Sequence, residues 1–186
     1  MHHRSSSTPE ISVVLAIRND EETVGHLVRA VAAHLRGLRR NFEIVAVNDS
    51  SRDNSLSIVS LLAPQMPELR IVRSNVGGRA FLRGTSEARG HVVVLLEAGH
   101  SVSLAPLGWA LSRLEAGREA VILRGRYIVA RRLLALPVIV RASGPGLFFE
   151  HLFERRARDL GIDVVGTRPR SPAPLLLRPV LRFLAA

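Results

Sequence analysis

Acidic and polar side chains gather in three short stretches, and each stretch directly follows a run of apolar residues. The stretches are Arg18-Asn19-Asp20-Glu21-Glu22, Asn48-Asp49-Ser50-Ser51-Arg52-Asp53 and Glu97-Ala98-Gly99-His100. Carboxylate and amide groups can hydrogen-bond a nucleobase or a ribose, and carboxylate oxygens are ligands of hard cations such as Mg2+ and Mn2+. The same residue types also cap helices and form turns, so a purely structural interpretation of these stretches stays open.

The elements that would position these stretches follow from the hydrophobic pattern between Ile11 and Leu123, where short apolar runs alternate with amphipathic stretches of helical length. This alternation predicts an α/β fold, a three-layer sandwich whose mostly parallel sheet is covered by helices. Strands are expected at Ile11–Ile17, Phe42–Val47, Leu69–Val72, His91–Leu96 and Ala120–Leu123. Helices are expected after Asp20, with Asn19 or Asp20 as the cap, at Ser55–Leu62, at Gly77–Ala88, and from a cap at Ser103 to about Leu114.

The polar stretches follow the first, second and fourth of these strands. In an open parallel sheet, ligands bind outside the carboxyl ends of the strands. Asn48, Asp49 and Glu97 are therefore expected at one edge of the sheet, with their side chains around one depression.

The chain after Leu123 is less regular. Tyr127–Leu136 fits either a strand or a helix, Leu147–Leu160 predicts a helix ended by Gly161, and Ile162–Val165 predicts a short strand. The prolines that follow can continue neither a helix nor a central strand. We expect a flexible tail at residues 1–10, one domain at residues 11–166, and a separate Pro/Arg/Leu-rich segment at residues 167–186.

Charge is distributed unevenly along the chain. The net charge is +10 and all 26 basic residues are arginine, with 12 arginines against 4 acids in residues 124–186. This surplus favours an anionic partner, which can be a lipid head group, a membrane surface or nucleic acid. Nucleic acid ranks last, since aromatic residues make up 4% of the chain and no nucleic-acid motif is present.

Other classes of site and location are limited by composition. With no cysteine, disulfides, thiolate nucleophiles and zinc-thiolate sites are excluded. No apolar run approaches the roughly 20 residues that span a bilayer, and the polar start lacks the pattern of a secretory signal. We expect a cytoplasmic protein, either free or peripheral to the inner face of the membrane.

The linear order of these motifs resembles family 2 glycosyltransferases of the GT-A fold. Residues 13–22 are similar to the opening of that family, and residues 43–55 resemble its strand ending in paired aspartates. Asn75-Val76-Gly77 with Ala80 and Gly84 resembles its Asn-x-Gly helix, and Glu97-Ala98-Gly99 falls where the family has Asp-x-Asp. Residues 124–132 are similar to the arginine segment of the polyprenyl-phosphate sugar synthases.

The resemblance implies a donor site for a nucleotide or nucleotide sugar, with Glu97 as a ligand of Mg2+ or Mn2+. The nucleotide-binding residues that it implies are Ala16, Arg18, Asp20, Asn48, Asp49 and Arg79.

Departures from the family pattern limit the chemistry. Gly99 offers no second metal carboxylate, Asn48 replaces an aspartate, and Arg18 replaces an aromatic residue. His100 could ligate a softer metal. The acceptor segment that the family has before its arginine segment is missing, because the two parts are fused at Leu123-Arg124.

Two functions remain open. The first is a non-catalytic descendant of the fold that binds a nucleotide or another protein as a scaffold. The second is an active minimal glycosyltransferase that moves a sugar from a nucleotide sugar to a polyprenyl phosphate or a similar acceptor. The loss of a metal carboxylate favours the first, with weak and nearly metal-independent nucleotide binding in which Arg79 contacts phosphate.

Overall fold

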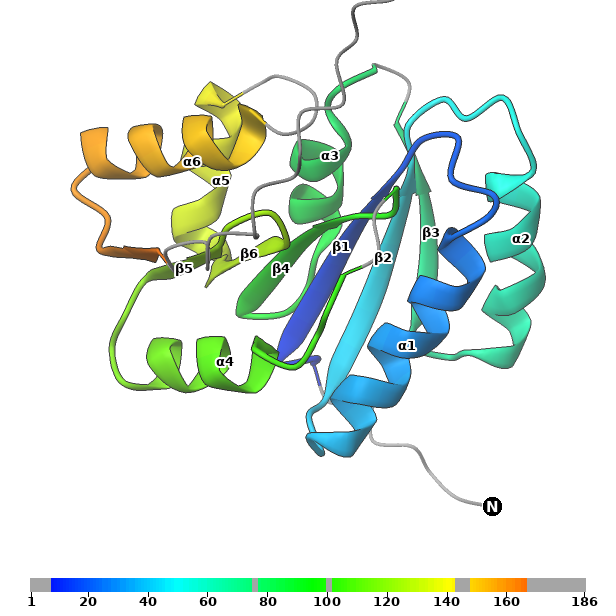
Figure 1. Ribbon diagram of the computed structural model, residues 1–186, viewed down its shortest axis with the longest axis horizontal. Helices are drawn as coiled ribbons and strands as arrows, with labels where there is room; N and C mark the ends of the chain where they lie inside the picture. Colours follow the sequence, from blue (N-terminus) through cyan, green and yellow to red (C-terminus); the bar gives the residue numbers. More distant parts are fainter. Residues whose placement is uncertain (1–7, 75–76, 100–101, 143–147, 167–186) are drawn as a thin grey trace, which may run out of the picture.

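The computed structural model describes residues 8–74, 77–99, 102–142 and 148–166. Within these residues, seven strands form one sheet in the order β3-β2-β1-β4-β6-β5-β7 (Figure 1). The strands are β1 (Ile11–Ile17), β2 (Phe42–Asn48), β3 (Leu69–Arg73), β4 (Val92–Glu97), β5 (Ala120–Leu123), β6 (Tyr127–Arg131) and β7 (Val164–Gly166). Residues 1–7 of the tail predicted at residues 1–10, and the whole segment predicted at residues 167–186, lie outside the described residues.

The sheet is mostly parallel. Strand β1 pairs in parallel with β2 and β4, and β2 pairs in parallel with β3. Strand β6 runs antiparallel to both of its neighbours, β4 and β5, while β7 is parallel to β5. The prediction of a mostly parallel sheet is therefore confirmed.

Helices cover both faces of the sheet, as the three-layer prediction requires (Figure 1). They are α1 (Val24–Gly37), α2 (Ser55–Leu62), α3 (Ala80–Glu87), α4 (Leu107–Glu115), α5 (Arg132–Arg141) and α6 (Phe148–Asp159), with a short 3-10 helix, η1, at Ala63–Gln65. Helices α1, α2 and α4 share one core with Val13 and Leu15 of β1, while α3, α5 and α6 share the other with Val14. Both faces of β1 are buried because successive side chains of a strand point to opposite faces.

The two predicted helix caps are wrong. Helix α1 has Thr23 at its N-cap position, and α4 has Pro106 at its own. The side chain of Asn19 accepts a hydrogen bond from the N–H of Arg52, and that of Asp20 accepts one from the N–H of Arg18. Loop hydrogen bonds thus engage side chains that sequence reasoning assigned to a helix terminus.

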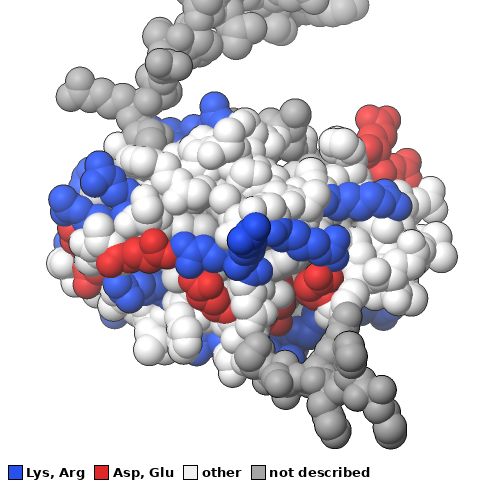
Figure 2. All heavy atoms as spheres, turned by 90° about the horizontal axis from the view of Figure 1, so that it is seen from below, with Lys and Arg blue, Asp and Glu red and all other residues white. Residues whose placement is uncertain are grey.

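Charges at the edge formed by the amino ends of the strands are paired. Seen from below, this part of the surface carries basic and acidic side chains next to one another (Figure 2). Arg40 bonds both Glu10 and Glu115, and Arg118 bonds Asp163 at 2.6 Å. None of the described helices is long and apolar enough to cross a membrane.

Helix α3 lies very close to the sheet at Gly84. A Cβ atom added there would lie 2.3 Å from Cγ1 of Val14 and 2.8 Å from Cγ2 of Val47, so α3 would have to move outward. We expect Gly84→Ala to lower the free energy of unfolding by about 1–3 kcal/mol because it overpacks this contact. Urea denaturation measures the change.

Gly37 provides the matched control, since it also lies in a helix but an added Cβ would meet nothing within 4 Å. Gly37→Ala should leave stability unchanged or raise it slightly. Equal losses in the two variants would contradict the close approach of α3 to the sheet.

Candidate functional site

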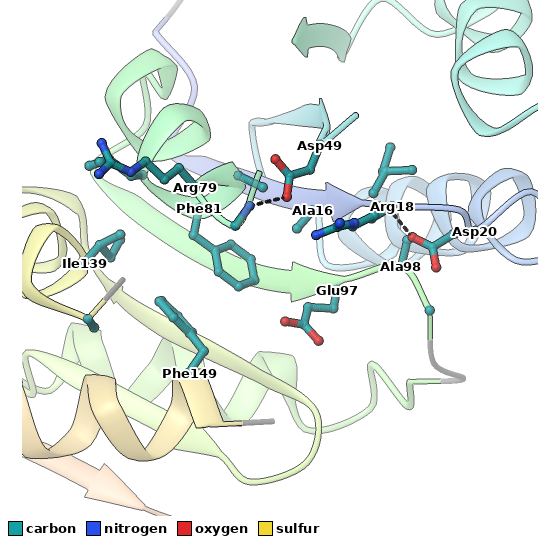
Figure 3. Close-up of a pocket in the computed structure, with 16 residues that line it drawn as sticks. Ala16, Arg18, Asp20, Asp49, Arg79, Phe81, Glu97, Ala98, Ile139 and Phe149 are labelled. Atoms are coloured by element: carbon teal, nitrogen blue, oxygen red, sulfur yellow. Dashed lines mark hydrogen bonds between the residues drawn. The ribbon is translucent and has the colours of Figure 1, made fainter. Parts of the chain in front are cut away.

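A cavity of about 280 Å3 opens at the carboxyl ends of the parallel strands (Figure 3). Its lining residues come from β1, β4, α3, α5 and α6 and from the loops after β1, β2 and β4. They are Ala16, Ile17, Arg18, Asp20, Asp49, Gly78, Arg79, Ala80, Phe81, Leu82, Glu97, Ala98, Gly99, Ile139, Ala142 and Phe149. The volume approaches that of pockets for small molecules, which are about 300–1,000 Å3.

Strand register brings the predicted acids together at this edge. Ile17 pairs with Asn48, and Ala16 pairs with Glu97. The prediction of a common edge is confirmed, and Asp49 and Glu97 both line the cavity. Asn48 does not line it, although its side chain is 93% buried and its Oδ1 has no hydrogen-bond partner among the described residues.

Asp49 is held rigidly and still offers an oxygen. Its N–H donates to the carbonyl of Ile17 at 2.8 Å, and its Oδ2 accepts from the N–H of Gly78 at 2.7 Å. The side chain is 95% buried, and its Oδ1 has no partner within the described part of the chain. A buried acceptor without a donor is rare and costly, so this oxygen is suited to a ligand donor.

Two arginines flank the cavity from different elements. Arg18 follows β1, Arg79 precedes α3, and both are exposed. Nη1 of Arg18 lies 3.9 Å from the position of a Cβ at Gly77, so this guanidinium reaches across to the turn before α3. In Figure 3, Arg18 and Glu97 lie on the same side of the cavity, whereas Arg79 extends along α3 and away from Glu97. Arg18 is therefore the better placed of the two for an anionic ligand.

The predicted metal site has few donors. Within the described residues, no group of three or more His, Cys, Asp or Glu side chains could hold an ion. A Cβ at Gly99 would lie 2.9 Å from Oδ1 of Asp20, so the Asp20 carboxylate already fills the space where a second ligand would begin. His100 lies outside the described residues, as do Asn75 and Val76 of the Asn-x-Gly motif. The described donor set thus does not fit a metal held by several protein ligands.

The loops after β1 and β2 are joined by their own polar groups. The N–H of Glu21 donates to Oδ2 of Asp53, and that of Asn54 donates to Oε2 of Glu21. The N–H of Asp20 donates to Oγ of Ser55 at 2.8 Å. Much of the polarity that predicted a ligand site therefore serves to fix these two loops, which matches the structural interpretation left open above.

An apolar wall of the cavity was missed by sequence reasoning. Phe81 of α3 and Phe149 of α6 pack with ring centroids 4.6 Å apart and ring planes tilted by 36°, and Ile139 of α5 lies on the same side (Figure 3). The sequence had placed these two aromatic residues in the helices predicted at Gly77–Ala88 and Leu147–Leu160, with no sign that they meet. Periodicity alone could not assign these side chains to a cavity, because aromatic residues on helices usually pack into the core.

A tight hairpin stands at the join between β5 and β6, where the acceptor segment was expected to be missing. Gly125 has φ of +67°, and its N–H donates to Oε2 of Glu150. Arg124 bonds the buried carboxylate of Glu154 at 2.6 Å, and Arg158 bonds the same carboxylate. Helix α6 therefore fixes the hairpin directly beside the cavity.

The sheet topology, the two helical layers and the ligand edge define the class as an α/β domain of the GT-A type. The chain belongs to the family described as glycosyl transferase family 2, whose model matches residues 12–159.

Curated relatives match only part of the chain. The undecaprenyl-phosphate 4-deoxy-4-formamido-L-arabinose transferases of Pseudomonas fluorescens strain Pf-5 and Pseudomonas paraeruginosa are 34% and 36% identical over 92 residues. The match covers 47% of this chain and 27% of each of those proteins. The chain thus matches about a quarter of the length of these relatives.

Solved structures are similar over most of the chain. A mannosyltransferase from Pyrobaculum calidifontis, in complex with GDP-Man and Mn2+, aligns with a TM-score of 0.67 at 17% identity over 88% of this chain and 56% of that one. Glucosyl-3-phosphoglycerate synthase from Mycobacterium tuberculosis, in complex with UDP, aligns with a TM-score of 0.64 at 19% identity over 90% and 74%. At this level of identity, the likeness establishes the shared fold.

Proposed function

We propose that this domain binds a nucleoside diphosphate or nucleotide sugar in the cavity at the carboxyl edge and does not transfer the sugar. The observation that carries the proposal is the position of Asp20, whose Oδ1 lies 2.9 Å from where a side chain at Gly99 would begin. Gly99 itself carries no carboxylate, and the Asp20 carboxylate beside it already accepts a hydrogen bond from the N–H of Arg18, so the pair of acids that would hold a metal at the leaving diphosphate is incomplete. Charge neutralisation of a leaving group is often the largest catalytic contribution, so its loss favours binding without turnover.

The cavity keeps features that suit a nucleotide. The unpartnered Oδ1 of Asp49 can accept from a base or a ribose, and Arg18 can bond phosphate through charge-assisted hydrogen bonds. The solved structures named above bind GDP-Man with Mn2+, or UDP, on the same fold. Asn48 is proposed to contribute only after a side-chain movement, since it does not line the cavity.

Calorimetric titration tests the proposal with UDP, GDP and their sugars, with and without Mn2+. We expect weak binding that neither Mn2+ nor a chelator changes, because the described residues around the cavity offer few ligands to bridge a metal to the diphosphate. A parallel assay with a polyprenyl phosphate acceptor should detect no transfer. Tight, chelator-sensitive binding of a nucleotide sugar would overturn the proposal in favour of an active minimal glycosyltransferase, the activity named for the curated relatives.

A further inference from the structure

Helix α5 is apolar on both of its sides. Its inner residues Ala135, Val138 and Ile139 are buried in the core shared with α3 and α6. On the outside, Leu133 is 74% exposed and Val140 is 57% exposed. Pro137 is exposed as well, and the spacing of residues 133, 137 and 140 places all three on one stripe. Contiguous exposed apolar patches are typical of protein and membrane interaction sites.

Along the chain, the outer face of α5, defined as Leu133, Pro137 and Val140, is flanked by positive charge only. The helix begins at Arg132 and ends at the exposed Arg141. Residues 120–149 contain five arginines and no aspartate or glutamate. At the amino edge of the sheet, by contrast, Arg40 lies between Glu10 and Glu115.

We propose that the outer face of α5 docks on an anionic lipid membrane, with its apolar stripe at the acyl boundary and its arginines at the head groups. A second copy of the chain would bring the same arginines to the interface. Residues 167–186 contain four arginines and no acid, so they carry the same sign. An anionic membrane is the partner that satisfies both the apolar stripe and the positive border.

This inference is independent of nucleotide binding, although the two surfaces are related in space. Ile139 on the inner side of α5 lines the cavity, so the docking face and the cavity belong to the same helix. Docking would therefore bring one wall of the cavity close to the membrane surface.

Vesicle sedimentation of the full chain tests the proposal, with phosphatidylcholine alone and with equal amounts of phosphatidylcholine and phosphatidylglycerol. We expect binding only to the anionic vesicles, falling as salt is raised. The double variant Leu133→Gln and Val140→Gln should weaken partitioning about tenfold, because two apolar side chains no longer favour the acyl boundary. Leu61→Gln is the matched control, since Leu61 is 72% exposed on α2 at the opposite face of the sheet and should have no effect.

A fluorescence measurement locates the contact. The single tryptophan, Trp109, lies on α4 across the sheet, so Trp109→Phe removes the background. In that variant, Leu133→Trp should shift to shorter emission wavelength when phosphatidylglycerol vesicles are added.

Several outcomes would overturn the proposal. One is vesicle binding that the double variant leaves unchanged, which would assign membrane contact to another part of the chain. Another is an introduced indole that already emits at short wavelength in buffer and does not respond to vesicles, since the chain itself would then cover the face. A third is a dimer that the double variant dissociates, without vesicle binding by either protein.

Discussion

Arg18→Ala is expected to weaken the binding of UDP or GDP about tenfold, because a hydrogen bond between charged groups contributes about 1.5–3 kcal/mol and part of this is lost to solvent at an exposed site. Arg79→Ala should have a smaller effect, since Arg79 extends along α3 and away from Glu97 (Figure 3). Binding by the unmodified protein should fall with rising salt, and the Arg18→Ala variant should show a shallower dependence. Calorimetry over a salt series measures both quantities.

Arg52 supplies the control for this experiment. It is exposed on the loop after β2 and does not line the cavity, so Arg52→Ala removes the same charge close by. Nucleotide affinity should stay within about twofold of the unmodified protein, as expected for a screened surface charge. If Arg52→Ala and Arg18→Ala weaken binding equally, the effect is one of overall charge and the proposed phosphate contact is wrong.

Glu43→Ala should lower the free energy of unfolding by about 3 kcal/mol, the lower end of the range for breaking a buried ion pair. The Glu43 carboxylate is 94% buried and joins three segments of the chain. It accepts hydrogen bonds from Oγ of Ser12 and the N–H of Arg89, each at 2.7 Å, and from Nε of Arg70 at 3.0 Å. Removing it leaves these donors without their acceptor in the protein interior, which urea denaturation would detect.

Glu87→Ala is the comparison for Glu43→Ala. Glu87 also pairs with an arginine, Arg83, but both side chains are substantially exposed. Its replacement should change stability by less than about 1 kcal/mol, as for most surface pairs. Similar losses of stability in the two variants would show that burial of the Glu43 carboxylate does not determine its contribution to the free energy of unfolding.

The sequence was most informative where a buried apolar run is followed directly by a polar loop. The buried strands before Asp20, Asn48 and Glu97 were predicted within a residue or two, because both faces of β1, β2 and β4 are apolar and a polar loop ends each run. The shared edge followed from the parallel order of those strands. The segment from Tyr127 stayed ambiguous because β6 ends at Arg131 and α5 begins at Arg132 with no turn residue between them, and periodicity cannot assign the short apolar runs on either side.

The side-chain partners could not be predicted. Asn19 and Asp20 had the right residue types for a helix cap, but only the fold shows their partners: the side chain of Asn19 accepts from the N–H of Arg52 in the loop after β2, and the N–H of Asp20 donates to Oγ of Ser55. The apolar wall was missed for a related reason, since Phe81 and Phe149 meet only when α3 and α6 lie side by side.

The hydrogen bonds between the loops after β1 and β2 also affect the free energy of ligand binding. Glu21, Asp53 and Asn54 already fix the backbone on one side of the cavity before anything binds. Association usually loses free energy to the ordering of loops and side chains. Here most of that ordering is complete in the folded chain, so hydrogen exchange of these amides should be nearly the same with and without nucleotide.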